Sequence, residues 1–166
     1  MAKKIFWVIA FLVIISITLI AVLNVKVAKF YFIDYKGNPN ISYIRFLVLS
    51  SNKTEALEKV IDEYLNYAKN NYVNSELLPY MKLKNVKVVK NQCLINMDML
   101  KSNNIEYSSF AETRSLVMLF KTIKDFDKDI KNFRIIGIEK YFRHIDTRFP
   151  LSLDGNNLIM LLADQK

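Results

Sequence analysis

The chain has 166 residues, of which 52% are hydrophobic, and it contains only three glycines and three prolines. This composition excludes a disordered or fibrous protein and is sufficient for one hydrophobic core. Four lysines beside an N-terminal apolar run supply half of the net charge of +8, which leaves 20 basic against 16 acidic residues, and we expect no nucleic-acid binding.

The N-terminal apolar run begins at Ile5, ends at Leu23 and contains 19 uncharged residues. A helix rises about 1.5 Å per residue, so a run of this length reaches across a hydrocarbon core. Lysines at both ends and Trp7 near one end are typical of membrane flanks. The run therefore predicts a transmembrane helix in contact with the lipid bilayer. We interpret residues 1–28 as an uncleaved anchor of a single-pass membrane protein and residues 29–166 as one extracytoplasmic domain.

A cleavable signal peptide is the alternative interpretation, because it shares the basic start and the apolar middle. Its cleavage sites are poor, since a cut after Ala21 or Ala28 places Leu19 or Lys26 three positions before the bond. The only cysteine, Cys93, lies far downstream. This position excludes lipid attachment at the end of the run, and a lone cysteine excludes an internal disulfide.

The first half of the remaining chain predicts a β-hairpin followed by a helix. Residues 29–34 and 42–50 have strand patterns around a turn at 36–40, and Ile44, Phe46 and Val48 share one face while Arg45 lies on the other. After Ser50 the apolar period changes to 3.6, which predicts an amphipathic helix that Asn52 can cap and that packs on its own sheet. Its apolar stripe comprises Leu57, Val60, Ile61, Tyr64, Leu65 and Ala68.

The second half predicts three strands, one helix and a tail. After a loop at 70–80, residues 83–89 and 92–99 are two strands, and Cys93 shares the apolar face of the second, as expected for a buried small hydrophobe. A helix opens at Ser109, with Glu112 completing a capping box, and continues to Phe126. Residues 133–139 are a strand, 143–154 an irregular tail, and 158–162 either a last edge strand or a docking segment. The economical fold class is α+β, a small sandwich with a mainly antiparallel sheet and two helices on one face.

One acidic segment resembles the opening of a calcium loop. Asp125, Asp127 and Asp129 follow the D-x-D-x-D pattern. The sixth position requires glycine and the twelfth requires glutamate, but these positions hold Ile130 and Ile136. We therefore interpret the segment as a helix end with solvated acids, and we predict neither a metal nor a cofactor.

His144 and Asp146 suggest a general base and its orienting carboxylate, with Ser152 or Cys93 as a conceivable nucleophile. No nucleophile elbow accompanies them, and Cys93 occupies a core-facing strand position. Three isolated glycines cannot form a phosphate-binding loop. The sequence thus predicts a protein that is not an enzyme and has no catalytic residues.

Several strings of the sequence resemble the GerMN domain family, first described in the sporulation and germination protein GerM. The first covers Tyr31-Phe32-Ile33-Asp34-Tyr35-Lys36-Gly37, with Arg45 on the next strand. The others are Leu78-Pro79 with Met81-Lys82-Leu83-Lys84-Asn85-Val86-Lys87-Val88, Leu119-Phe120-Lys121-Thr122-Ile123-Lys124-Asp125-Phe126, and His144-Ile145-Asp146-Thr147-Arg148-Phe149-Pro150-Leu151. The chain departs from the family in having neither a lipobox nor room for paired domains.

This resemblance implies a small α+β domain outside the bacterial cytoplasmic membrane, without known catalysis, that serves envelope scaffolding or assembly. We therefore expect a non-enzymatic interaction domain whose partners are envelope proteins or copies of itself. The alternative is a binding module for a cell-wall glycan or peptide, with a concave site built from some of the nine tyrosines. A hydrolase built around His144 is a third possibility.

Overall fold

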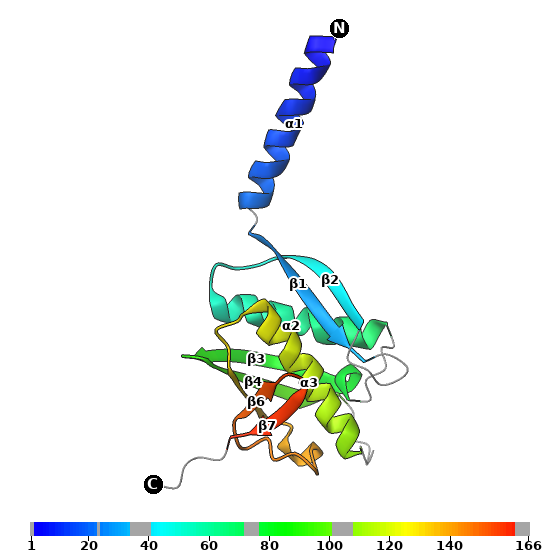
Figure 1. Ribbon diagram of the computed structural model, residues 1–166, viewed down its shortest axis with the longest axis vertical. Coiled ribbons are helices and arrows are strands. Elements are labelled where there is room, and N and C mark those ends of the chain that lie inside the picture. The colour runs from blue at the N-terminus through cyan, green and yellow to red at the C-terminus, as the bar shows by residue number, and fades with distance from the viewer. Residues whose placement is uncertain (1, 23, 34–40, 72–76, 101–107, 162–166) are drawn as a thin grey trace.

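A computed structural model describes residues 2–22, 24–33, 41–71, 77–100 and 108–161 (Figure 1). The predicted turn at 36–40 and the middle of the predicted loop at 70–80 lie outside these residues. The helices are α1 (Ala2–Val22), α2 (Lys53–Asn70) and α3 (Ser109–Phe126), with short 3-10 turns η1 (Leu78–Tyr80) and η2 (Glu139–Tyr141). The strands are β1 (Val25–Phe32), β2 (Ile41–Val48), β3 (Met81–Val89), β4 (Gln92–Met99), β5 (Asn132–Ile136), β6 (Leu151–Asp154) and β7 (Asn157–Met160).

The fold class is α+β, as predicted, but the layers differ from the prediction. The strands form two sheets, β1-β2 and β3-β4-β5-β6-β7. Helices α2 and α3 lie between them, because α2 packs on β3 while α3 packs on β1 (Figure 1). The second edge of β1 is occupied by helix side chains: the Tyr31 amide donates to Thr122 Oγ1 at 3.1 Å, and the Tyr64 hydroxyl donates to the Tyr31 carbonyl at 2.9 Å. Since these groups are already bonded, β1 does not join the larger sheet.

The prediction of a transmembrane anchor at residues 5–23 is contradicted. Crossing a hydrocarbon core about 30 Å thick requires roughly 20 consecutive, mostly apolar residues. Within the described part of the chain, no helix combines that length with that apolarity. The helix that was interpreted as a single-pass anchor is α1, which ends at Val22, three residues before β1 begins.

Helix α2 confirms the predicted stripe. All six predicted residues are buried, together with Ala56. The Asn52 side chain caps the helix by accepting the amides of Thr54 and Glu55. Such a cap satisfies donors that have no partner within the first helical turn.

The larger sheet is antiparallel except at one pair. Strands β4 and β5 run parallel, with α3 as the connection between them, as a parallel crossover requires. Strand β5 ends at Ile136. The next residue, Gly137, has a φ of +93°, and an added Cβ there would lie 2.4 Å from the Met97 carbonyl oxygen. The predicted strand at 133–139 is therefore three residues too long at its end.

The predicted irregular tail contains a strand. Residues 151–154 form β6, which makes a hairpin with the edge strand β7 through Gly155 and Asn156. Gly155 has a φ of +60°, the left-handed conformation that a two-residue hairpin turn requires and that glycine adopts without strain. The Gly-Asn pair was the signal in the sequence for this hairpin.

Candidate functional site

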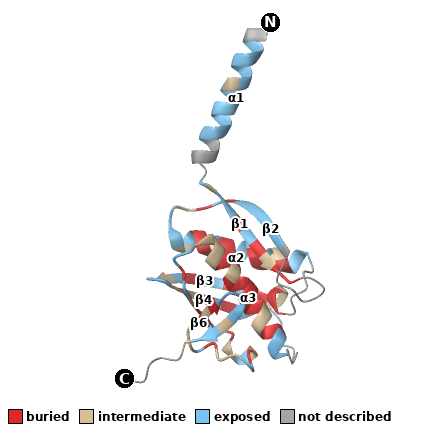
Figure 2. Cartoon of the chain, viewed as in Figure 1, coloured by how far each residue is buried: buried red, intermediate tan, exposed pale blue. Residues whose placement is uncertain are grey.

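The most conspicuous surface feature of the domain is an apolar face on the β1-β2 sheet. We call the side chains of Val27, Ile44, Phe46 and Val48 the outer face; they are exposed by 52%, 57%, 73% and 47%. The strands pair antiparallel with Val27 opposite Phe46, so these side chains are neighbours on one side of the sheet. Figure 2 colours β2 largely as exposed. Ile44, Phe46 and Val48 share one face, as the sequence predicted.

The opposite side of the same sheet belongs to the core. Ala28, Phe30, Phe32 and Leu47 are buried, and they alternate with the exposed residues as the two-residue period of a strand demands. A sheet that packs on one side normally carries polar residues on the other. Here the solvent side of β2 carries three large apolar residues instead.

Aromatic packing holds this sheet firmly against α2. The ring of Phe32 stacks on that of Tyr64, with centroids 4.9 Å apart and planes 10° apart, and Phe30 meets the edge of Tyr64 at 5.6 Å. Burial raises the pKa of Tyr64 well above its ordinary value, so this phenol stays neutral and serves as a donor. The outer face therefore rests on a rigid support.

The charge of this sheet has one sign. Strands β1 and β2 contain Lys26, Lys29 and Arg45 but no acidic residue. The Arg45 guanidinium carbon lies 4.4 Å from the centroid of the Tyr67 ring, a cation–π contact on the side of the sheet opposite Phe46. The two strands that carry the outer face thus contribute cations but no carboxylate.

A second feature surrounds the loop after η2. A cavity of about 450 Å³ is lined by residues 139–140 and 142–148. Glu112 of α3 is fully buried, and its carboxylate accepts the amides of Arg143 at 2.9 Å and His144 at 3.0 Å. Glu112 therefore fixes this loop, a function that the sequence analysis missed because it assigned Glu112 to a capping box. The true N-cap is Ser108, which accepts the amide of Ala111.

The structure does not assemble the catalytic groups considered above. The Asp146 carboxylate accepts two hydrogen bonds from the Arg148 guanidinium, at 2.8 and 2.7 Å. This side-chain pairing with Arg148 lowers the pKa of Asp146. His144 contacts Glu112 through its backbone amide. Ser152 and Cys93 lie on β6 and β4.

Nor do the acids of the calcium-like segment converge. The Asp125 carboxylate bonds to the Lys128 ammonium and to the Tyr31 hydroxyl. Asp127 and Asp129 instead share the Lys53 ammonium, at 2.9 and 3.3 Å. These ion pairs join the end of α3 to the start of α2.

Cys93 is completely buried, as predicted. Burial, reinforced by the nearby Asp127 charge, raises the pKa of its thiol to about 12.

We expect a disulfide reagent at pH 8 to modify Cys93 of the native protein at least about 100-fold more slowly than Cys93 of the urea-unfolded chain, because the thiolate is the reactive form. In the unfolded chain the Cys93 thiol ionises near pH 8.5, whereas in the folded protein it ionises only near pH 12. Between these values the unfolded state gains from ionisation and the folded state does not, so the free energy of unfolding should fall as the pH rises above about 8.5. Equal modification rates in the two states would contradict this placement.

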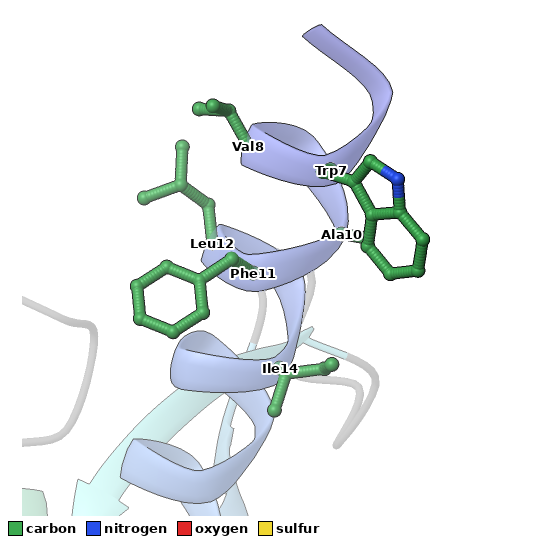
Figure 3. A pocket seen from close by; sticks show the side chains of 6 residues that line it. All are labelled: Trp7, Val8, Ala10, Phe11, Leu12 and Ile14. Atoms are coloured by element: carbon green, nitrogen blue, oxygen red, sulfur yellow. The ribbon is translucent and has the colours of Figure 1, made fainter. Parts of the chain in front are cut away.

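A hollow of about 500 Å³ is lined only by residues of α1 (Figure 3). The labelled side chains, among them Trp7, Phe11 and Ile14, project to different sides of a single helix. All of its lining residues come from this one helix, so we do not regard it as a ligand site.

Comparisons with known proteins provide little guidance. No family model matches the sequence, and no curated protein is significantly similar to it. One solved structure, described as "Putative Lipoprotein from Clostridium perfringens", is 16% identical, covers 77% of this chain and 87% of its own, and superposes with a TM-score of 0.45. A likeness at this level supports no statement about function, and the GerMN resemblance stays a prediction.

Proposed function

We propose that this chain is a non-enzymatic interaction domain of the cell envelope, and that it binds a protein partner through the outer face of the β1-β2 sheet. The observation that carries the proposal is the row of exposed apolar side chains at Val27, Ile44, Phe46 and Val48. Contiguous apolar surface on a folded domain commonly marks an interaction site. Burying it stabilises a complex by about 25 cal/mol for each Å² removed from water.

Two further observations support binding rather than catalysis. Two carboxylates that could serve as acids or bases are engaged in structural contacts, with Asp146 on Arg148 and Glu112 on the amides of the loop at 143–144. The aromatic rings behind the sheet are also structural, because Tyr64 and Phe32 stack in the core. These contacts leave the outer face as the best surface for a partner.

Site-specific photo-crosslinking in the cells that make the protein tests this proposal. A photoreactive phenylalanine analogue replaces Phe46 in the full chain, and in a matched control it replaces Glu63, which is exposed on α2. We expect a discrete adduct containing a second protein only at position 46, and its loss when Ile44→Ser is added. Equal adducts at both positions, or no adduct at position 46, would overturn the proposal. Separation of cytosol from envelope tests the location, which requires the chain in the envelope fraction.

A further inference from the structure

The direction of the backbone groups of β2 follows from contacts made by β1. The amide and carbonyl of Tyr31 bond to Thr122 and Tyr64, so both point away from β2. Tyr31 pairs with Ser42. Two residues that lie opposite each other in an antiparallel ladder orient their backbone groups alike. When the amide and carbonyl of one residue point away from the neighbouring strand, those of the opposite residue also point away. The amide and carbonyl of Ser42 therefore point to the edge of β2 that is not paired with β1.

The alternation of the ladder extends this result along β2. Every second residue repeats the orientation of Ser42, so the backbone groups of Ile44, Phe46 and Val48 also point to the outer edge. The Leu49 amide donates to the Asn24 carbonyl at 3.2 Å. This bond is consistent with the alternation, because the backbone groups of odd-numbered residues should point toward β1. Among the described strands, β2 pairs with β1 alone. Ile44, Phe46 and Val48, the β2 residues of the outer face, therefore also present their backbone amides and carbonyls at the outer edge of the strand.

Within the described residues, this edge carries few of the features that normally prevent strands from pairing with other chains. Natural edge strands are short, bulged, covered by another element, or carry proline or charged side chains, lysine above all. Strand β2 has eight residues in continuous register with β1, and it contains neither lysine nor proline. Its one charged residue, Arg45, is turned to the Tyr67 side of the sheet. The edge is therefore competent to accept another strand.

We propose that β2 binds its partner by strand addition, and that the added strand has an apolar–acidic–apolar sequence opposite Ile44, Arg45 and Phe46. This inference rests on the proposed function and specifies how the protein partner binds to the β1-β2 sheet. Residues paired with Ile44 and Phe46 project onto the outer face and extend its apolar surface. The residue between them projects to the other side, directly across from Arg45, where an acidic side chain forms a cross-strand ion pair. Extended peptides bind exposed sheet edges in this manner in other domains.

A second copy of this chain fits the edge less well. Strand β2 contains no acidic residue, so no register of β2 against itself places a carboxylate opposite Arg45. In the two-fold register centred on Arg45, two guanidinium groups face each other, which is destabilising. Pairing β2 with β2 also leaves Ile44, Phe46 and Val48 of both copies exposed on the same side of the joined sheet. A partner with an acidic residue satisfies both the backbone and the charge.

Fluorescence anisotropy with labelled peptides tests the proposal on the full chain. The first probe has a Thr-Val-Glu-Val-Thr core, the second replaces Glu with Lys, and the third carries N-methyl groups on alternate backbone nitrogens. We expect the Glu peptide to bind about fivefold more tightly than the Lys peptide, and the N-methylated peptide to lose binding. The Arg45→Glu variant should reverse the order of the Glu and Lys peptides. Amide exchange should slow at Ile44 and Phe46 but not at Leu47 when the Glu peptide is bound.

The possible failures are distinguishable. Peptide binding that survives N-methylation would overturn strand addition while leaving a protein-binding outer face. Absence of peptide binding, together with a specific crosslink at position 46 in cells, would overturn this inference and leave the proposed function standing. Dimers that form with increasing protein concentration, without binding of the Glu peptide, would replace the partner strand with a second copy. Binding of the outer face to vesicles of anionic lipid, without binding to peptide, would overturn both proposals.

Discussion

Replacing Tyr64 with alanine is expected to lower the free energy of unfolding by about 4 kcal/mol. Tyr64 is fully buried, its ring stacks on Phe32 and contacts Phe30, and its hydroxyl donates to the Tyr31 carbonyl. The substitution leaves a cavity between α2 and β1 and removes the donor for a buried carbonyl. Urea unfolding followed by circular dichroism measures the change.

Tyr64→Phe is the matched control. It keeps the ring and both aromatic contacts but removes the hydroxyl, so the expected loss is only about 1 kcal/mol. If both variants were equally destabilised, the hydrogen bond to Tyr31 would dominate and the packing argument would be incorrect. If neither changed the urea midpoint, the β1-β2 sheet would not be packed on α2 as described.

Removing the carboxylate of Glu112 is expected to cost about 3 kcal/mol of unfolding free energy in the variant Glu112→Ala. The fully buried carboxylate accepts the amides of Arg143 and His144. Without it, two partly buried donors have no acceptor within α3. We expect faster hydrogen exchange at both amides, measured by NMR, together with a lower urea midpoint.

Two variants separate this effect from a general loss of charge. Glu112→Gln keeps one acceptor oxygen and should fall between the native protein and Glu112→Ala. Glu63→Ala removes an exposed glutamate of α2 and should change stability by less than about 0.5 kcal/mol. Should Glu63→Ala destabilise the protein as much as Glu112→Ala, the tethering role of Glu112 would be refuted.

Local patterns explain which parts of the fold could be predicted from the sequence. The prediction of the apolar stripe of α2 was correct because a 3.6-residue period of apolar residues directly reflects one buried face of a helix. The cap at Asn52 was correct because it involves only residues two and three positions away. Glu112 was misassigned for the complementary reason, since its partners are 31 and 32 residues away and no local pattern reveals them.

The division into two sheets depends on contacts between distant residues. Thr122 of α3 occupies the edge of β1 where a single sheet would have continued, and the sequence of β1 contains no sign of this. For the N-terminal helix, the sequence suggested a property that the structure does not support. Composition alone suggested a membrane anchor, whereas no described helix meets both requirements for crossing a membrane.

The candidate surface was only half predictable. Alternation placed Ile44, Phe46 and Val48 on one face, but the other face of β2 also carries apolar residues, among them Tyr43 and Leu47. With apolar side chains on both faces, the pattern cannot indicate which one packs on the core. The aromatic contacts of Tyr64 with Phe30 and Phe32 decide this, because they fix the side of β1 that is buried.

The bond between the Tyr31 amide and Thr122 spans 91 positions of the chain, and this separation affects the order of folding. On the ribosome, β1 and β2 emerge long before the helix that covers one edge of β1. Contacts between such distant residues form slowly, because a long loop must close first. During synthesis the nascent hairpin therefore has both strand edges open until α3 emerges, and open strand edges make this interval prone to aggregation.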